Sequence, residues 1–239
     1  MKLTRNALVL FPALLLMASV PSNKIDNKLP ATHISNVLPK ASVIDNHYAE
    51  WNLTAAGLSQ EAFDDAVKGY NYLQEKKLLN NTNVLTIVDY SKPSSQKRLY
   101  VLDMKNGKIL FNSLVAHGRN SGLEYATDFS NADESHKTSL GFFITLGTYI
   151  GGNGYSLKLQ GCEKGINDKA LERAIVIHGA PYADENFIQT NGYLGRSYGC
   201  PAVPEKISKK IIDTIKNGSC MFLYHPTKKY TAVSKILNS

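Results

Sequence analysis

Short segments with a two-residue hydrophobic period, separated by tight-turn signals, fill most of this 239-residue chain. Asn106-Gly107 and Asn153-Gly154 suit the positive φ angles of hairpin turns. The segments are rich in Val, Ile, Leu and Tyr, and they predict strands at 84–89, 98–104, 108–115, 139–146, 155–160, 173–178 and 221–224. A chain built in this way is restricted to a mostly β fold.

Two amphipathic helices accompany the strands. Apolar residues recur at helical spacing between Leu58 and Leu79, with Ser59 as the expected N-cap. A second, short helix is expected at Glu205–Lys216, where isoleucines line one face. The pattern predicts a single β-rich α+β domain, a sandwich or barrel-like sheet with a helical lead-in.

The ends of the chain differ from its middle in composition. Residues 1–22 have the short basic start and apolar run of a signal peptide. The apolar run would give about 18 Å of helix, too short for a bilayer core of roughly 30 Å, although an uncleaved anchor is the alternative. Residues 23–56 are expected as a linker or loosely ordered lead-in, 57–226 as the folded domain and 227–239 as a C-terminal tail. We therefore expect an exported protein, with no membrane span after removal of the leader.

The formal charge of +7 is carried by scattered Lys and Arg residues. This distribution lacks the basic, aromatic-interleaved stripe that nucleic-acid binding favours, and it suits a carboxylate-rich partner such as a cell wall. No His or Cys pair stands at a metal-ligand spacing, and Gly151–Gly154 lacks the Lys-Ser/Thr ending of a phosphate loop. We expect no metal and no cofactor.

The chain has three cysteines, so at least one is unpaired. Cys162 and Cys220 have apolar or small neighbours, and either buried thiols or a disulfide between them fits that setting. Cys200 differs, because it follows Gly199 and precedes Pro201 in a predicted loop. A free loop cysteine in an oxidising compartment is a liability unless its reactivity is used.

A nucleophilic role for Cys200 requires a base, and His178 ends an apolar, strand-like run upstream of it. Gly199 permits a sharp turn that exposes the sulfur, and Ser197 is suited to hold that turn by a side-chain hydrogen bond. The amides of Tyr198–Cys200 are candidate donors to an oxyanion. From the residues alone, a buried structural cysteine and a merely hydrogen-bonded histidine are equally open readings.

A wider motif carries a family resemblance. Ile177-His178-Gly179 followed by Ser197-Tyr198-Gly199-Cys200 resembles the signature of YkuD-type L,D-transpeptidases. The longer run Leu194-Gly195-Arg196-Ser197-Tyr198-Gly199-Cys200-Pro201-Ala202-Val203-Pro204 is similar to the murein L,D-transpeptidase branch of that superfamily. The likeness extends over roughly residues 58–224.

The resemblance implies a β-rich catalytic domain in the periplasm or cell wall that acts on peptidoglycan tetrapeptide stems. Cys200 would attack the L-centre carbonyl of diaminopimelate, D-alanine would leave, and another stem's amine would take the acyl group. His178 would transfer the protons, a backbone carbonyl would orient it, and amides near Gly199 and Cys200 would bind the oxyanion. An L,D-carboxypeptidase and a non-catalytic wall-binding module are the alternatives.

Two departures from the family pattern bear on the substrate. Ala202 stands where most YkuD-type enzymes have an arginine, and the His–Cys interval implies an inserted loop at Tyr182–Tyr193. Arg196 and, with weaker claims, Arg119 and Lys137 are candidates to bind a substrate carboxylate in place of the missing guanidinium. Gly179 is a further candidate for the substrate-binding surface.

Overall fold

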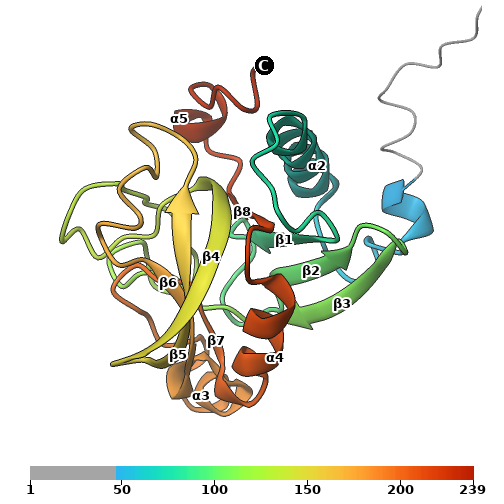
Figure 1. Cartoon of the computed structure of the whole chain (residues 1–239). Coiled ribbons are helices and arrows are strands. Elements are labelled where there is room, and N and C mark those ends of the chain that lie inside the picture. The colour runs from blue at the N-terminus through green and yellow to red at the C-terminus, as the bar shows by residue number, and fades with distance from the viewer. Residues whose placement is uncertain (1–46) are drawn as a thin grey trace, which may run out of the picture. The chain divides into compact units, whose positions relative to one another are not determined.

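The computed structural model describes residues 47–239 (Figure 1). The signal peptide expected at 1–22 and most of the lead-in expected at 23–56 lie outside the described residues. Within residues 47–239, no helix combines the length and the apolar character needed to cross a membrane.

Eight strands form one mixed sheet, with the order β3-β2-β1-β8-β4-β5-β6-β7. Two neighbouring pairs, β1 with β8 and β6 with β7, run parallel, and the other pairs are antiparallel. The strands are β1 (Val84–Asp89), β2 (Leu99–Asp103), β3 (Lys108–Ser113), β4 (Gly141–Gly151), β5 (Gly154–Gly161), β6 (Val176–Ala180), β7 (Ala202–Pro204) and β8 (Cys220–Tyr224). This architecture confirms the β-rich fold expected from the period-two segments.

The helices pack against the strands through close approaches at glycine. Helix α2 (Gln60–Glu75) begins as expected, because the Ser59 side chain accepts a hydrogen bond from Ala62 N at 3.3 Å. A Cβ added at Gly69 of α2 would lie 2.0 Å from the ring of Phe142, so the helix backbone lies directly on this side chain of β4. Helix α4 (Glu205–Ile215) packs on β6 in the same manner, because a Cβ added at Gly179 of β6 would lie 2.7 Å from Ser208 Oγ of α4.

The register of the last strand pair brings His178 close to Cys200. Strand β6 carries His178, which pairs with Ala202 at the start of β7. Cys200 precedes Ala202 by two residues, so it enters β7 beside the histidine strand. The chain between the two strands forms the 3-10 helix η1 (Pro181–Ala183) and the helix α3 (Glu185–Asn191). The expected inserted loop therefore contains helical structure.

The C-terminal residues, expected as a tail, instead pack onto the domain. After α5 (Lys228–Thr231), Ile236 and Leu237 are buried. The buried carboxylate of Glu163 accepts hydrogen bonds from Tyr230 Oη at 3.1 Å and from Ser234 Oγ. These bonds tie the end of the chain to β4, because Glu163 also accepts from Phe142 N at 2.8 Å.

The described end of the lead-in is also more ordered than its composition predicts. Leu53 is fully buried, and the Trp51 ring packs edge-on to Phe63 of α2 with ring centroids 5.8 Å apart. Polar composition hid this contact, since only a few apolar side chains make it.

The cysteines are not cross-linked to each other. Cys162 and Cys220 are free thiols in the structure, and Cys220 is completely buried in β8. Burial raises the pKa of Cys162 to about 12, so this thiol is far from reactive at neutral pH.

Candidate active site

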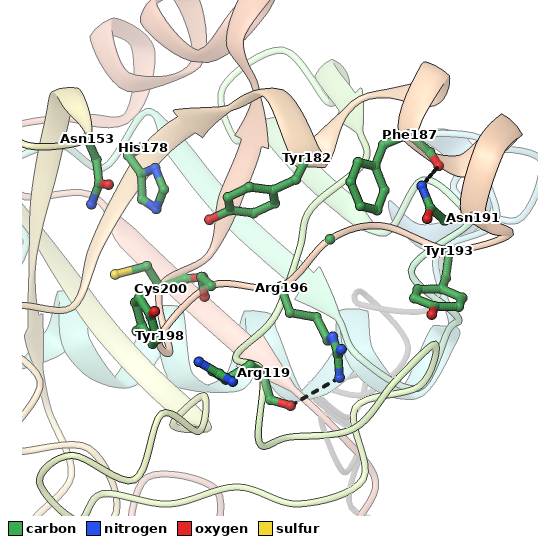
Figure 2. Close-up of a pocket in the computed structure, with 12 residues that line it drawn as sticks. Arg119, Asn153, His178, Tyr182, Phe187, Asn191, Tyr193, Arg196, Tyr198 and Cys200 are labelled. Atoms are coloured by element: carbon green, nitrogen blue, oxygen red, sulfur yellow. Dashed lines mark hydrogen bonds between the residues drawn. The ribbon is translucent and has the colours of Figure 1, made fainter.

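One cavity of about 550 Å³ contains both residues of the expected catalytic pair (Figure 2). His178 comes from β6, Cys200 from the turn before β7, and Asn153 from the tip of the β4–β5 hairpin. The cavity is lined by Arg119, Asn153, His178, Tyr182, Phe187, Asn191, Tyr193, Gly195, Arg196, Ser197, Tyr198 and Cys200. Its only charged lining side chains, within the part of the chain that the structure describes, are arginines.

The His178 ring is oriented by a backbone carbonyl. Its Nδ1 lies 2.9 Å from Gly179 O, and because a carbonyl oxygen only accepts, Nδ1 carries the proton and Nε2 keeps its lone pair. Burial lowers the pKa of His178 below its usual value, against a smaller opposite effect of the Gly179 carbonyl. The ring is therefore a neutral base at pH 7. Gly179 itself does not line the cavity, since a Cβ there would meet Ser208 Oγ at 2.7 Å.

The Cys200 thiol contacts backbone groups at and just before the start of β6. Val176 N donates to its sulfur at 3.5 Å, and the thiol donates weakly to Ala174 O at 3.8 Å. Among the hydrogen bonds of residues 47–239, none joins Cys200 to His178. Rotation about the Cα–Cβ bond of Cys200 is the motion that would turn the sulfur toward the imidazole, and catalytic hydrogen bonds often tighten only with substrate bound.

The electrostatics of the resting site oppose a preformed ion pair. Burial raises the pKa of the Cys200 thiol, and the Val176 amide and the Arg173 guanidinium only partly offset this effect. The pKa of His178 is shifted down. A raised thiol pKa together with a lowered imidazole pKa keeps the proton on the sulfur in the resting site.

This charge state predicts the pH dependence of thiol labelling. The rate of Cys200 alkylation by iodoacetamide is expected to be slow at neutral pH and to rise through the alkaline range, because only the thiolate reacts. Stopped labelling followed by mass spectrometry of the Cys200 peptide measures this profile. A plateau already reached near pH 6 to 7 would show instead a stable thiolate–imidazolium pair.

The turn that carries Cys200 is held by Ser197. Its Oγ accepts from Gly199 N at 3.0 Å and donates to Cys200 O at 2.6 Å. Gly199 has φ +123°, a conformation that favours glycine, and an added Cβ would lie 3.0 Å from Lys137 O. The turn-holding role expected of Ser197 is therefore present in the geometry. The Gly199 amide is not available to an oxyanion, because Ser197 already takes its hydrogen.

Arg173 holds the segment that packs against the turn, and the sequence patterns did not single it out. Its guanidinium donates to Lys137 O at 2.9 Å and to Ser139 Oγ at 2.7 Å. One of its nitrogens lies 3.6 Å from the Cβ position of Gly199. Arg173 thus brings a half-buried positive charge close to Cys200, in a chain that has Ala202 where the family pattern has an arginine.

Another arginine, Arg98, is fully buried behind the neighbouring loop. Arg98 Nη2 contacts Nδ1 of the fully buried His117 at 2.8 Å. Because the guanidinium only donates, Nδ1 of His117 must be the unprotonated nitrogen. Ser197 N donates to His117 O at 3.0 Å, and Arg119 N donates to Ser197 O at 2.8 Å. The Arg98–His117 contact therefore positions the segment that flanks the Ser197–Cys200 turn.

The neutral state of His117 predicts an acid-sensitive fold. Burial and the Arg98 charge lower the pKa of His117 to about 3, whereas the unfolded chain takes up that proton near pH 6.5. The unfolded state thus binds more protons between these values. The free energy of unfolding is expected to fall by up to about 1.4 kcal/mol per pH unit as pH drops through this range. Urea unfolding at several pH values measures the slope.

His117→Asn is the control for this slope. The Asn amide oxygen accepts from Arg98 as Nδ1 does, but the amide does not titrate. The variant is expected to lose less stability per pH unit than the wild type between pH 6 and pH 4. Equal slopes would contradict the assignment to His117.

The remaining candidates for carboxylate binding differ in their availability. Arg196 lines the cavity, but its Nη1 donates to the carbonyls of Arg119 and Gly122 at 3.3 and 3.2 Å. Lys137 is ion-paired with Asp128 and does not line the cavity. The Arg119 guanidinium lies over the Tyr198 ring, 5.5 Å from its centroid, and forms no hydrogen bond with the described residues. Arg119 is thus the best placed of the three.

Comparison with known proteins identifies the family of the folded domain. Residues 54–224 match the family model of the L,D-transpeptidase catalytic domain. No curated protein matches the chain at a significant level. Similar solved structures include an L,D-transpeptidase from Mycobacterium smegmatis, with 14% identity, a TM-score of 0.38 and coverage of 60% of this chain and 59% of that one.

Two further solved structures show the same level of likeness. An L,D-transpeptidase from Mycobacterium tuberculosis H37Rv has 14% identity, a TM-score of 0.36 and coverage of 60% of this chain and 58% of that one. The cell shape determining protein Pgp2 of Campylobacter jejuni has 14% identity, a TM-score of 0.40 and coverage of 67% and 54%. The chain spans little more than half the length of these structures. From the match over residues 54–224, the chain belongs to the L,D-transpeptidase catalytic domain family.

Proposed function

We propose that this chain is an exported peptidoglycan L,D-transpeptidase that works through a thioester on Cys200. The observation that carries the proposal is that Cys200 and His178 face one cavity whose charged lining residues, within 47–239, are arginines. A nucleophile, a neutral base and a positively charged wall suit acyl transfer from a carboxylate-bearing peptide.

The acyl transfer follows from the protonation states of the site. His178 Nε2 takes the thiol proton as Sγ of Cys200 attacks the carbonyl carbon of the stem's third residue. The tetrahedral intermediate collapses, the carbon–nitrogen bond breaks, and the D-alanine amine leaves with the proton from His178. The amine of a second stem then attacks the thioester by the same steps in reverse, which restores the thiol and forms a 3→3 cross-link.

Arg119 is proposed to hold a carboxylate of the donor stem. Its guanidinium has no acidic partner among the described residues and is stacked on the exposed Tyr198 ring at the cavity edge. Arg119→Met is expected to raise KM for a tetrapeptide by about tenfold, as loss of one charge-assisted hydrogen bond does, with little change in kcat. Arg119→Lys is expected to recover part of the affinity. An unchanged KM in Arg119→Met would remove Arg119 from the substrate site.

The proposed function is tested with purified protein and disaccharide tetrapeptide muropeptides. Release of D-alanine together with cross-linked dimers, separated by chromatography and identified by mass spectrometry, is the expected result. Release of D-alanine with tripeptide as the only other product would identify a carboxypeptidase. Failure to release D-alanine from any tetrapeptide would contradict both activities and favour a wall-binding role.

Export is proposed from the leader at 1–22. A fusion of these residues to a reporter that is active only outside the cytoplasm tests it, with residues 23–56 alone as the matched control. Reporter activity with both segments, or with neither, would contradict the assignment.

A further inference from the structure

Tyr182 is placed to act directly on the reacting carbonyl. It is the second residue of η1, immediately after the strand that carries His178. Its ring extends into the cavity, and the hydroxyl points toward the space between His178 and Cys200 (Figure 2). None of the sequence patterns singled it out, except as the first residue of the inserted loop.

The position of the Tyr182 ring is set by its contact with the chain at Gly195. A Cβ added at Gly195 would lie 2.4 Å from Tyr182 Cβ, so the chain at 195 passes directly against this side chain. Gly195 N also donates to Tyr182 O at 2.8 Å. A glycine at 195 thus allows the two segments to approach, and the contact holds the ring in place.

The Tyr182 hydroxyl is an unused donor. It forms no hydrogen bond with any residue in 47–239. Burial, and to a smaller extent the nearby Cys200, raises the pKa of Tyr182 to about 12, so the phenol keeps its proton at every pH at which the enzyme would work. A phenolic O–H that is held in place within the cavity is a ready donor to developing negative charge.

The turn that carries Cys200 supplies few free donors for an oxyanion. Effective oxyanion holes aim preorganised donors at the oxygen of the tetrahedral intermediate. The Gly199 amide is taken by Ser197 Oγ at 3.0 Å. The amides of Tyr198 and Cys200 have no acceptor among the described residues, and of these two only the Cys200 amide belongs to the residue that carries the sulfur.

We propose that the Tyr182 hydroxyl is the second oxyanion donor, opposite the Cys200 amide. This role rests on the proposed acyl transfer at Cys200. As the carbon–sulfur bond forms, the carbonyl π electrons move onto oxygen. Tyr182 then donates a hydrogen bond to that oxygen while keeping its proton. When the carbonyl re-forms, the bond to the leaving amine breaks, and His178 supplies the amine with its proton.

The test compares two reactions of the same thiol. Acylation of Cys200 by p-nitrophenyl acetate passes through a tetrahedral oxyanion, whereas alkylation by iodoacetamide displaces iodide directly and forms none. Tyr182→Phe is expected to lower the second-order acylation rate by about 10²-fold, as loss of one oxyanion donor does, and to leave the alkylation rate within about twofold. Nitrophenolate release and mass spectrometry of the Cys200 peptide are the readouts.

Tyr125→Phe is the matched control. It removes the same atom from an exposed tyrosine that does not line the cavity, and both rates should equal those of the wild type. Equal acylation rates in wild type and Tyr182→Phe would overturn the proposal. A parallel fall in acylation and alkylation would overturn it too, since it would show a general disturbance of the thiol. A wild-type Cys200 that accepts no acyl group from the ester would instead contradict the proposed function itself, and with it the role of Tyr182.

Discussion

Cys200→Ala is expected to lower the release of D-alanine from tetrapeptide stems by at least about 10⁴-fold, because removal of a nucleophile leaves only direct attack by water. The expected loss lies in kcat rather than in KM, since the cavity that binds the stem keeps its arginines and its aromatic wall. Mass spectrometry of the intact protein with substrate should show an acyl adduct in the wild type and none in the variant.

Cys162→Ala provides the matched control for this experiment. Cys162 is also half-buried and free, but it lies outside the cavity, and burial raises its pKa to about 12. This variant should keep its activity within about twofold, as expected for a small change away from the reacting groups. Comparable losses of activity in the two variants would show that the effect comes from disturbed folding. Retained turnover in Cys200→Ala would eliminate the thioester mechanism.

Arg98→Met is expected to lower the free energy of unfolding by about 3 to 5 kcal/mol, because each buried acceptor left without a donor costs about 1 to 3 kcal/mol. Arg98 is fully buried and donates to Val115 O at 2.9 Å and to Lys92 O at 2.8 Å, in addition to His117. Met fills a similar volume but leaves these acceptors without a donor and without water. Urea unfolding measures the loss, with Lys97→Met as the control.

The control removes a neighbouring positive charge that is exposed, so its stability should change by less than about 0.5 kcal/mol. Equal stability of Arg98→Met and wild type would show that its hydrogen bonds are offset by the cost of burying the guanidinium. Because His117 O accepts from Ser197 N, Arg98→Met is also expected to lower acylation at temperatures where the variant is still folded.

Much of the fold was accessible from local patterns. The strand expected at Val84–Asp89 has the bounds found in the structure, and the helix capped by Ser59 begins where the capping residue predicts. These elements are long enough for their hydrophobic period to be read, and their burial follows that period. The three-residue strand β7 has no readable period, and it becomes a strand only because β6 lies beside it.

The supporting residues of the site could not be found in this way. Cys200 and His178 stand within a motif, but Arg173, Tyr182 and Asn153 reach the site through sheet topology and loop packing. A lone arginine before a strand has no distinctive spacing. The availability of an amide also depends on its partner, and so the engagement of Gly199 by Ser197 became visible only in three dimensions.

The parallel pairing of β6 with β7 leaves most of the chain between these two strands free to vary. The register His178↔Ala202 fixes the backbone positions that carry His178 and Cys200, whatever the length of the chain between them. Helices η1 and α3, with Tyr182 and Phe187 on the cavity wall, belong to this intervening excursion. Lengthening such an excursion costs little entropy once its ends are held, since a doubling adds only about 0.6 kcal/mol. The part of the excursion that follows η1, which includes α3 and Phe187, can therefore be exchanged without moving His178, Tyr182 or Cys200, and it is the natural place to alter what the cavity accepts.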